Sequence, residues 1–345
     1  MQTLHTRRGC IGTSASVSAV FQGDSRWYGG CSGGERATDA PNTESTAAMM
    51  NRLALALAAL VSVASTACGN VDDLPTETTG SATADYNWAY DSARGLRIGT
   101  WNLKRLGQGD KRLDLVARVI DTQFDIIAVQ EVMTPTALQP LMDLLPGWSA
   151  QLSERAVGRS GYYEYYAVLY RSAQATVTSS RVVDDAADEW YREPMVTCMR
   201  ANAADFCLVV THIVYGTTVG PRDAEIQALG RLVSGLRAAG TEKDYVVLGD
   251  YNRQASAPGF STLQASGWAF NDDGTVRTTL GTTSYSNPYD HAMIDPGYTR
   301  EWTGLSGRFD LVGAVCGGSY AFCAQYVSDH APVGVLFAAD ASDDD

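Results

Sequence analysis

Six short segments of the sequence end in side chains that can bind a cation or move a proton. Apolar runs bounded by glycine or polar residues are typical of buried strands. The ends of these segments read TWN (100–102), VQE (129–131), VTH (210–212), VLGDYN (247–252), YDH (289–291) and SDH (328–330). Because ligand sites gather where strands end on one rim of a sheet, we expect these side chains to lie close together.

Each of these residues also has a structural explanation. An Asn or Asp after a strand is usually a turn former, and a His beside an Asp is commonly part of a hydrogen-bonded pair. Six such ends in one chain, several of them with histidine, are hard to assign to turns alone. An oxygen-rich cluster of this kind suits Mg²⁺ or Mn²⁺ better than zinc, which prefers more His and Cys.

The elements that must position these residues form a strand-rich set. Apolar residues at helical spacing predict helices at 113–120 and 222–239. The expected strands cover 96–101, 125–130, 166–170, 195–199, 206–211, 245–248, 292–294 and 333–337. Many strands with three or four helices predict an α+β fold in which two sheets pack together and the helices lie outside them.

The composition excludes several classes of protein. The formal net charge of −13 argues against a basic module that binds nucleic acid by phosphate neutralisation alone. It is compatible with an enzyme that approaches phosphates through a divalent metal, because a bound cation reverses the local field. The sequence contains no GxxxxGK[ST], HExxH or CxxC pattern, so P-loop, zincin and zinc-ribbon chemistry lack their usual signatures.

An apolar segment near residue 50 has the pattern of a secretion signal. Met49 and Met50 precede Arg52 and an apolar run over residues 53–63. The run has the length that a signal peptide needs, about 7–15 residues, and is shorter than the ~20 residues of a membrane-spanning helix. Small residues and Cys68 follow, which resembles a lipoprotein signal with an acylated cysteine; a buried apolar helix is the alternative.

This signal divides the chain into expected parts. Residues 1–48 would precede the true translation start or be disordered, and 49–67 would be the signal peptide. A flexible tether over 68–92 would lead to one large domain over 93–339, followed by an acidic tail over 340–345. The protein would be a monomer, either secreted or held at the outer surface or in the periplasm of a bacterium through an acylated cysteine.

The spacing of four cysteines agrees with export. Cys198 and Cys207 flank a segment that reads as a hairpin turn, and Cys316 and Cys323 flank a Gly-Gly-Ser turn. Two local disulfides in an oxidising compartment are therefore predicted. Free thiols in the core are the alternative.

The motifs TWNL, AVQEV, VVTH, VLGDYN, YDHAMI and SDHAPV follow one another in the order found in a known group of proteins. They resemble the serial motifs of the endonuclease/exonuclease/phosphatase superfamily, and the resemblance runs from about residue 96 to residue 337. It implies a DNase I-like four-layer α/β sandwich, with two packed mixed β-sheets flanked by helices. It also implies a divalent-metal-dependent hydrolase that cuts phosphodiester bonds by in-line attack of water.

Three further segments resemble the DNase I-like nucleases within this superfamily. They are VGRSGYYEYY (157–166), REP (192–194) and DAEI (223–226). These features belong to the nuclease branch rather than to the sphingomyelinase or inositol-phosphatase branches. The resemblance therefore implies a secreted or surface-tethered endodeoxyribonuclease with DNA as its substrate.

The resemblance implies two kinds of catalytic group. Glu131 would be the main ligand of Mg²⁺ or Mn²⁺, with Asn102 and Asp329 near it in role, and a structural Ca²⁺ is left open as a second ion. The remaining groups would be a general acid and a general base on opposite sides of one phosphate. They are His330 oriented by Asp290 and His212 oriented by Glu164, with Asp250 holding the metal or the scissile phosphate.

Four further residues would contact the substrate. Arg192 would meet the phosphate, and Asn252 would hold the metal or the phosphate. Lys104 and Tyr162 would touch the flanking strand, Tyr162 by stacking on a base. Ordinary packing is an equally good explanation for Tyr162, which lies in a tyrosine-rich stretch.

Two departures from the nuclease pattern keep other functions open. Met133 stands where the DNase I-like pattern has a groove-reading Arg, and Tyr285 or Ser286 stands near a position where it has Thr. Met133 and the acidic composition weaken the expected DNA contacts. A phosphodiesterase or phosphatase acting on lipid headgroups or nucleotides is therefore the alternative. A non-catalytic binding protein is disfavoured, because every expected ionisable group is present.

Overall fold

The computed structural model describes residues 85–91 and 95–338. The expected leader, signal peptide, acidic tail and most of the expected tether lie outside the described residues. Within the described part, no helix combines the length and the apolar character that crossing a membrane requires.

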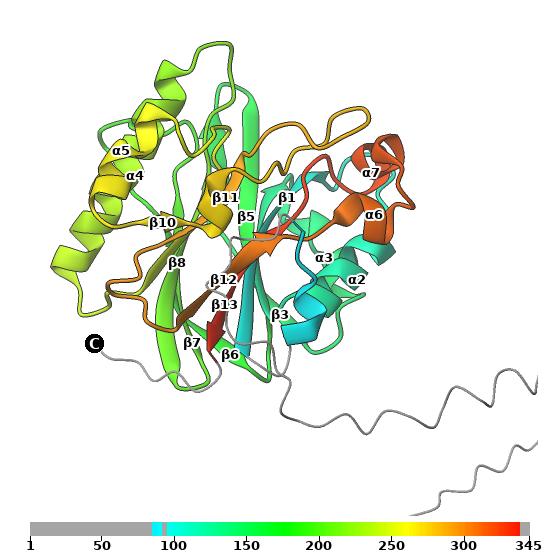
Figure 1. The fold of residues 1–345 in the computed structure, drawn as a ribbon, viewed down its shortest axis with the longest axis horizontal. Coiled ribbons are helices and arrows are strands. Elements are labelled where there is room, and N and C mark those ends of the chain that lie inside the picture. The colour runs from blue at the N-terminus through cyan, green and yellow to red at the C-terminus, as the bar shows by residue number, and fades with distance from the viewer. Residues whose placement is uncertain (1–84, 92–94, 339–345) are drawn as a thin grey trace, which may run out of the picture. The chain divides into compact units, whose positions relative to one another are not determined.

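Two mixed sheets form the body of the domain (Figure 1). The first runs in the order β12 (Trp302–Arg308), β13 (Val333–Ala338), β1 (Gly95–Leu106), β2 (Ile126–Val132), β5 (Tyr162–Arg171) and β3 (Trp148–Leu152), and β4 (Val157–Arg159) also pairs with β5. The second runs in the order β10 (Ala269–Phe270), β11 (Asp290–Ile294), β9 (Tyr245–Asp250), β8 (Ala204–His212), β7 (Met195–Ala201) and β6 (Ala175–Val182). Only β1–β2 and β8–β9 pair in parallel among these described strands.

Helices cover the outer face of each sheet (Figure 1). The first sheet carries α2 (Leu113–Gln123), α3 (Gln139–Met142), α6 (Leu311–Val315) and α7 (Tyr320–Tyr326), and the second carries α4 (Gly220–Ala239) and α5 (Ser261–Ala265). Short 3₁₀ turns lie at η1 (Trp88–Asp91), η2 (Pro135–Ala137), η3 (Pro258–Phe260) and η4 (Asn271–Gly274). The layers are thus helix, sheet, sheet and helix, which confirms the expected four-layer sandwich.

Side-chain alternation along the strands explains why both sheet faces are buried. On β1, Ile98 packs between the two sheets, whereas Trp101 and Leu103 pack against the helices of the first sheet. Leu248 on β9 faces the same inter-sheet core as Ile98, and its neighbour Val247 faces the helices of the second sheet. Since successive strand residues point to opposite faces, a strand buried on both faces reads as a continuous apolar run.

The folded domain begins earlier than the sequence predicts. Residues 85–91 fall in the predicted tether, yet the Trp88 side chain is fully buried in the core cluster that contains Phe124. Asp85 forms an ion pair with Arg308, and the Tyr86 N–H donates to the Arg308 carbonyl at 2.7 Å. A Thr-, Asp- and Pro-rich composition predicts a tether, but a single aromatic side chain leaves no periodic signal that would mark where packing begins.

Both predicted disulfides are present in the structure. Cys198 and Cys207 lie directly opposite each other on β7 and β8, with their Cα atoms 3.9 Å apart. Cys316 follows α6 and joins Cys323 of α7, with a Cα–Cα distance of 5.5 Å. The second bridge therefore fixes the two short helices that precede the SDH segment.

Replacing Trp88 should test where the domain begins. We expect Trp88→Ala to lower the free energy of unfolding by about 3–5 kcal/mol, because it removes a large buried side chain. The matched control is Leu144→Ala, whose side chain is 47% exposed and whose loss should cost about 0.5 kcal/mol or less. Urea unfolding of the two variants measures the difference. Equal stabilities would mean that residues 85–91 do not belong to the folded domain.

Candidate active site

The polar side chains meet at one edge of the two sheets, although not all of them end a strand: Asp290 begins β11, and the SDH segment precedes β13. In the second sheet, strand pairing places His212 opposite Asp250 and Asp250 opposite Asp290. In the first sheet, Asn102 lies opposite Gln130 on the parallel strand β2, and Glu131 follows. The Asn102 side-chain amide donates to Asp250 Oδ2 across the two sheets at 3.1 Å. Parallel pairing thus brings strand ends that are distant in the sequence to the same place.

Unusual backbone conformations occur at these strand ends. Four of the seven non-glycine residues with positive φ in the described chain are Lys104, Arg105, Glu131 and Asn252, with φ between 46° and 61°. The β1–β2 register shifts between Asn102 and Leu106, so the strands bulge there. A bulge re-aims the side chains near it, and residues held in this region of φ are strained and cluster at functional sites.

The first histidine–carboxylate pair is His212 with Glu164. His212 Nδ1 lies 2.9 Å from Glu164 Oε1, and Arg192 Nε lies 3.1 Å from Glu164 Oε2. All three side chains are buried. Burial and the Arg192 charge lower the pKa of His212, but Glu164 and Asp250 raise it by more, so the pKa lies above its ordinary value. Glu164 holds the ring through Nδ1, so Nε2 remains available for proton transfer.

The second pair is His330 with Asp290. His330 Nδ1 lies 2.8 Å from Asp290 Oδ2, and the Thr278 hydroxyl donates to the same oxygen at 2.5 Å. Burial lowers the pKa of His330, but Asp290 and Asp250 outweigh it and raise the pKa to about 10. The ring is therefore charged at neutral pH in the protein without metal.

The two rings converge on one buried carboxylate. His212 Nε2 lies 3.6 Å and His330 Nε2 lies 3.7 Å from Asp250 Oδ2. Asp250 Oδ1 accepts the Asn252 N–H at 2.8 Å. Burial raises the pKa of Asp250, and the Asp290 charge adds to that effect against the lowering by the histidines. The two Nε2 atoms thus approach one point, His212 from the end of β8 and His330 from the segment that precedes β13.

Glu131 and Asn102 lie together, as predicted for a metal site. Glu131 Oε1 accepts the Asn102 amide at 3.1 Å, and Oε2 accepts the Arg105 N–H at 2.9 Å. Burial raises the pKa of Glu131, but His212, Asn102 and His330 outweigh it, so the pKa lies below its ordinary value. The Glu131 side chain is therefore an ionised carboxylate at neutral pH.

The charge balance of the site fits a divalent cation. Among the described residues, Glu164 is paired with Arg192, whereas neither Glu131 nor Asp250 has a Lys or Arg within ion-pair distance. Buried carboxylates without a cation are costly. A group of three ligand atoms within 4.8 Å of one another also occurs here, contributed by Asp250, Asp290 and His330. An oxygen-rich set of this kind suits Mg²⁺ or Mn²⁺.

Asp329 and Lys104 contact each other, whereas the sequence predicts Asp329 at the metal and Lys104 at the substrate. Asp329, predicted as a metal ligand, forms an ion pair with Lys104 at 3.1 Å and is about 38% exposed. Lys104 also donates to the Ala324 carbonyl at 2.7 Å, so its charge is already engaged. The sequence could not indicate this pairing, because the two residues lie more than two hundred positions apart.

The predicted substrate residues line the same edge. The Arg192 guanidinium lies 5.0 Å from the centre of the Tyr162 ring. Burial and the Glu131 charge raise the pKa of Tyr162. The Asn252 side chain donates to the Ile213 carbonyl at 2.9 Å, which fixes its amide.

Sequence reasoning missed two residues of this site. Arg105 is exposed, and its guanidinium lies 5.9 Å from the Tyr162 ring without an acidic partner among the described residues. The basic pair after Asn102 could have indicated it. Thr278 orients Asp290, but it carries no signal in the sequence because its partner is twelve residues away.

The third described histidine lies outside the site. The His291 ring packs against Tyr251, Phe260 and Phe270, and its Nε2 lies 2.9 Å from the Arg253 carbonyl. Burial lowers its pKa to about 4. His291 is therefore a neutral core histidine, although it follows Asp290 directly.

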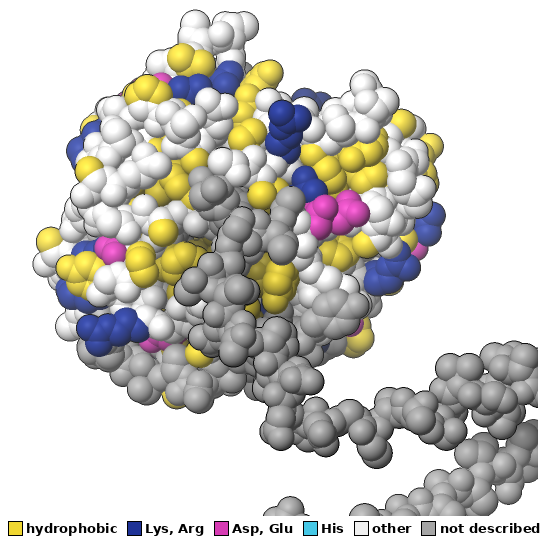
Figure 2. Space-filling view, viewed as in Figure 1, with side chains coloured by type: hydrophobic (Ala, Val, Ile, Leu, Met, Phe, Trp, Pro, Cys, Tyr) yellow, Lys and Arg dark blue, Asp and Glu magenta, His cyan; other side chains and the backbone are white. Residues whose placement is uncertain are grey.

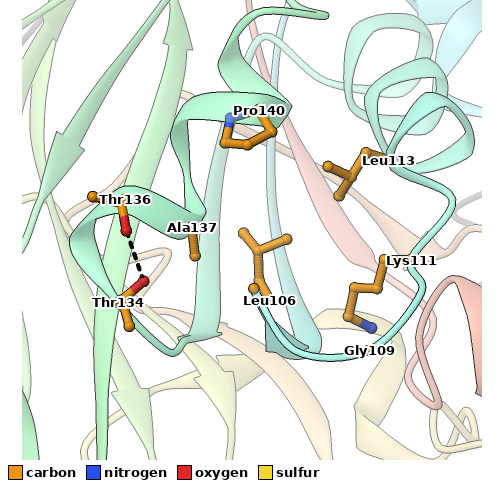
Figure 3. Close-up of a pocket in the computed structure, with 9 residues that line it drawn as sticks. Leu106, Gly109, Lys111, Leu113, Thr134, Thr136, Ala137 and Pro140 are labelled. Carbon is orange, nitrogen blue, oxygen red and sulfur yellow. Dashed lines mark hydrogen bonds between the residues drawn. The ribbon is translucent and has the colours of Figure 1, made fainter.

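A cavity of about 330 Å³ lies beside the site (Figure 3). Figure 3 shows Lys111, from the segment after β1, on one side and Thr134 and Thr136 on the other, with Leu106, the last residue of β1, between them. The Lys111 ammonium donates to the Val327 carbonyl at 3.1 Å, and burial lowers its pKa to about 8. None of the histidines or carboxylates described above lines this cavity.

Residues 99–330 match the endonuclease/exonuclease/phosphatase family. The chain belongs to this family. It is similar to a deoxyribonuclease from Thioalkalivibrio sp. (strain K90mix), with 33% identity over 258 residues that cover 70% of this chain and 71% of the relative. It is also similar to deoxyribonuclease-1-like 1 of Homo sapiens, with 28% identity over 276 residues that cover 71% of this chain and 85% of the relative.

Solved structures of the endonuclease/exonuclease/phosphatase family share the fold. The human Nocturnin catalytic domain aligns with a TM-score of 0.53 and 17% identity, covering 71% of this chain and 94% of that domain. The 3′ phosphatase NExo from Neisseria aligns with a TM-score of 0.51 and 18% identity, covering 70% of this chain and 99% of that protein. At these identities the likeness shows the fold alone.

The protonation of the histidines should be measurable in the metal-free protein. We expect His330 to stay doubly protonated through neutral pH and to titrate near pH 10, and His291 to stay neutral down to about pH 4. The His330 charge then stabilises the fold fully below the unfolded-state pKa of about 6.5, and this contribution is lost as the pH rises toward 10. Nitrogen-15 NMR of the rings follows both groups. Asp290→Asn should lower the pKa of His330, and an unshifted His330 titrating near 6.5 would contradict the geometry.

Proposed function

We propose that this protein is a divalent-metal-dependent DNase I-like endonuclease that hydrolyses phosphodiester bonds of DNA. The observation that supports it best is the convergence of the His212 and His330 Nε2 atoms on Asp250, beside the ionised Glu131. A site with two imidazoles, each oriented by a carboxylate at Nδ1, is suited to moving two protons at one phosphate. The relatives named deoxyribonuclease support DNA as the substrate.

The two histidines would share the proton transfers of hydrolysis. Glu164 and Asp290 each hold one ring by Nδ1, so that each Nε2 faces the site. The His330 ring, which is charged at neutral pH, would be the proton donor. One ring would take the proton of the attacking water, and the other would give a proton to the leaving oxygen. Arg192, which is buried behind Tyr162, would face a phosphate oxygen, and Asn252 would complete the contact.

A metal ion would be held by Glu131 with Asn102, and Asp329 remains a proposed outer member of the set. A bound divalent cation neutralises the charge that develops on the phosphate oxygens. Because the chain has a net charge of −13, it would repel a phosphate unless a bound cation offsets that charge locally. Figure 2 shows Lys and Arg side chains scattered over the visible face rather than gathered in one patch. A structural Ca²⁺ stays a prediction, since the described residues outside this site contain no second group of three ligands.

Export of the protein is also part of this proposal. The two disulfides are typical of an oxidising compartment, and the segment at 49–67 has the pattern of a signal peptide that ends before Cys68. A secreted or membrane-tethered monomer would meet DNA outside the cell. Palmitate labelling of the full chain expressed in bacteria, with Cys68→Ser as the control, would report the tether.

The Glu131 carboxylate offers the first test. We expect Glu131→Gln to lose most nicking of supercoiled plasmid in Mg²⁺, because the variant loses the charge of the metal ligand while the side chain keeps its size. Asp143→Asn, at an exposed acidic residue that follows α3, should cut like the wild type. Circular dichroism should show both variants folded. Full activity of Glu131→Gln at ordinary Mg²⁺ concentrations would remove Glu131 from the metal site.

The two histidines offer the second test. His212→Ala and His330→Ala should each slow single-turnover nicking by roughly 10²–10⁴, the range for general acid–base groups. The double variant should lose less than the product of the two, because groups that act as a unit are not additive. Asp290→Asn should reproduce most of the His330→Ala defect. Wild-type rates for both single variants would sink this mechanism, and a preference for lipid or nucleotide phosphoesters in a parallel assay would favour the alternative function.

A further inference from the structure

Among the large apolar and aromatic residues that the structure describes, Tyr215 is the most exposed, at 70%. It lies on the loop that joins β8 to α4, three residues after His212. The ring leaves a large aromatic surface in solvent, and burying a ring of this size against a partner is favourable. A molecule that binds at this edge of the sheets could therefore cover the exposed Tyr215 ring.

A buried arginine holds this ring beside the site. The Arg222 guanidinium lies 4.9 Å from the centre of the Tyr215 ring, although Arg222 itself is only 7% exposed. The same guanidinium donates to the Gly216 carbonyl and, at 3.1 Å, to the Asn252 carbonyl. Arg222 thus ties the loop to the strand end that carries Asn252, one of the proposed phosphate contacts.

A second contact fixes the start of this loop. The Val214 N–H donates to Glu225 Oε2 at 2.9 Å, and the other oxygen of Glu225 accepts the Tyr191 N–H at 3.0 Å. The backbone on both sides of Tyr215 is therefore anchored to α4. Because one face of the ring lies against a cation and the side chain is largely exposed, a flat surface remains open to solvent.

A planar ring backed by a guanidinium is suited to stacking on another planar ring. Among the substrates considered, a nucleobase has such a ring, whereas a lipid headgroup does not. Stacking on an aromatic side chain requires a base that is not already stacked within a duplex. The Arg222 charge beneath the ring also attracts the negative strand.

We propose that Tyr215 is the stacking platform for an unpaired base that flanks the scissile phosphodiester, on the Asn252 side of the site. This inference rests on the proposed nuclease function and deepens it, because it makes single-stranded nucleic acid the preferred substrate. A duplex must first open a base pair before the same contact can form, and that opening costs free energy.

The chain offers a matched control for this residue. Tyr298 is 47% exposed and lies over Arg237 at 4.2 Å, so it is also an exposed tyrosine backed by an arginine. It follows the end of β11 that is opposite to Asp290. Tyr298→Ala therefore removes the same kind of ring away from the site.

The test uses cleavage of a single-stranded oligonucleotide and of its duplex in Mg²⁺. We expect Tyr215→Ala to raise KM for the single strand by about 5- to 100-fold, in line with the loss of one stacked base, with kcat within about twofold. Tyr215→Phe should keep the wild-type KM because it keeps the ring, and Tyr298→Ala should change nothing. The duplex should show a smaller difference between the wild type and Tyr215→Ala.

Oligonucleotides with one abasic position next to the cleaved bond identify the contact. Removing the correct base should raise KM of the wild type but have little further effect on Tyr215→Ala, since the platform and its base act as one pair. Equal penalties in the two proteins, or Tyr215→Ala behaving like Tyr298→Ala, would overturn the inference.

A binding measurement separates this inference from the proposed function. Fluorescence anisotropy of a labelled single strand, in Ca²⁺ or in EDTA, reports binding without cleavage. A wild type that binds the strand through Tyr215 but never cuts it would contradict the nuclease proposal and leave the platform standing. A wild type that cuts the strand but binds it equally well without the Tyr215 ring would contradict the platform and leave the nuclease proposal standing.

Discussion

One buried carboxylate, that of Asp250, holds the two sheets together at the edge where the chemistry is expected. Its Oδ2 atom accepts the Asn102 amide of the first sheet, and both histidine Nε2 atoms approach the same oxygen. A buried carboxylate is costly unless it is hydrogen-bonded and paired. The arrangement of Asn102, His212 and His330 around it is therefore a requirement of the fold as well as of a catalyst, and changes at Asp250 should disturb both sheets.

The strained strand ends show how the remaining structure supports this arrangement. Glu131 and Asn252 adopt positive φ without being glycine, which costs of order 1–3 kcal/mol at each position. The Glu131 conformation is held by the Arg105 N–H on its carboxylate, and the Asn252 conformation by two hydrogen bonds, one to Asp250 and one to the Ile213 carbonyl. Three apolar clusters beneath supply the stability that such positions require.

Much of the fold could be predicted from the sequence, because the central strands are buried on both faces and read as apolar runs that end in polar residues. The edge strands β6 and β12 could not, because they lack that pattern. In β6 the residues between Ala175 and Val182 are exposed or half-buried, and β12 carries Gly and polar residues where a buried strand would be apolar. The helices α3, α5, α6 and α7 are too short to show a helical period. In the site, contacts between distant residues, such as Lys104 with Asp329, leave no local signal.

The hydrogen bonds between β1 and the SDH segment have a consequence for the order in which the protein is made. The Trp101 indole donates to the His330 carbonyl across 229 positions, and the Ser328 hydroxyl donates to the Asn102 carbonyl across 226. Contacts of such sequence separation form late, since a long loop must close first. During synthesis β1 emerges early, but its partner β13 is almost the last strand to be made. A chain that is interrupted before residue 330 therefore lacks both His330 and the strand that joins β12 to β1.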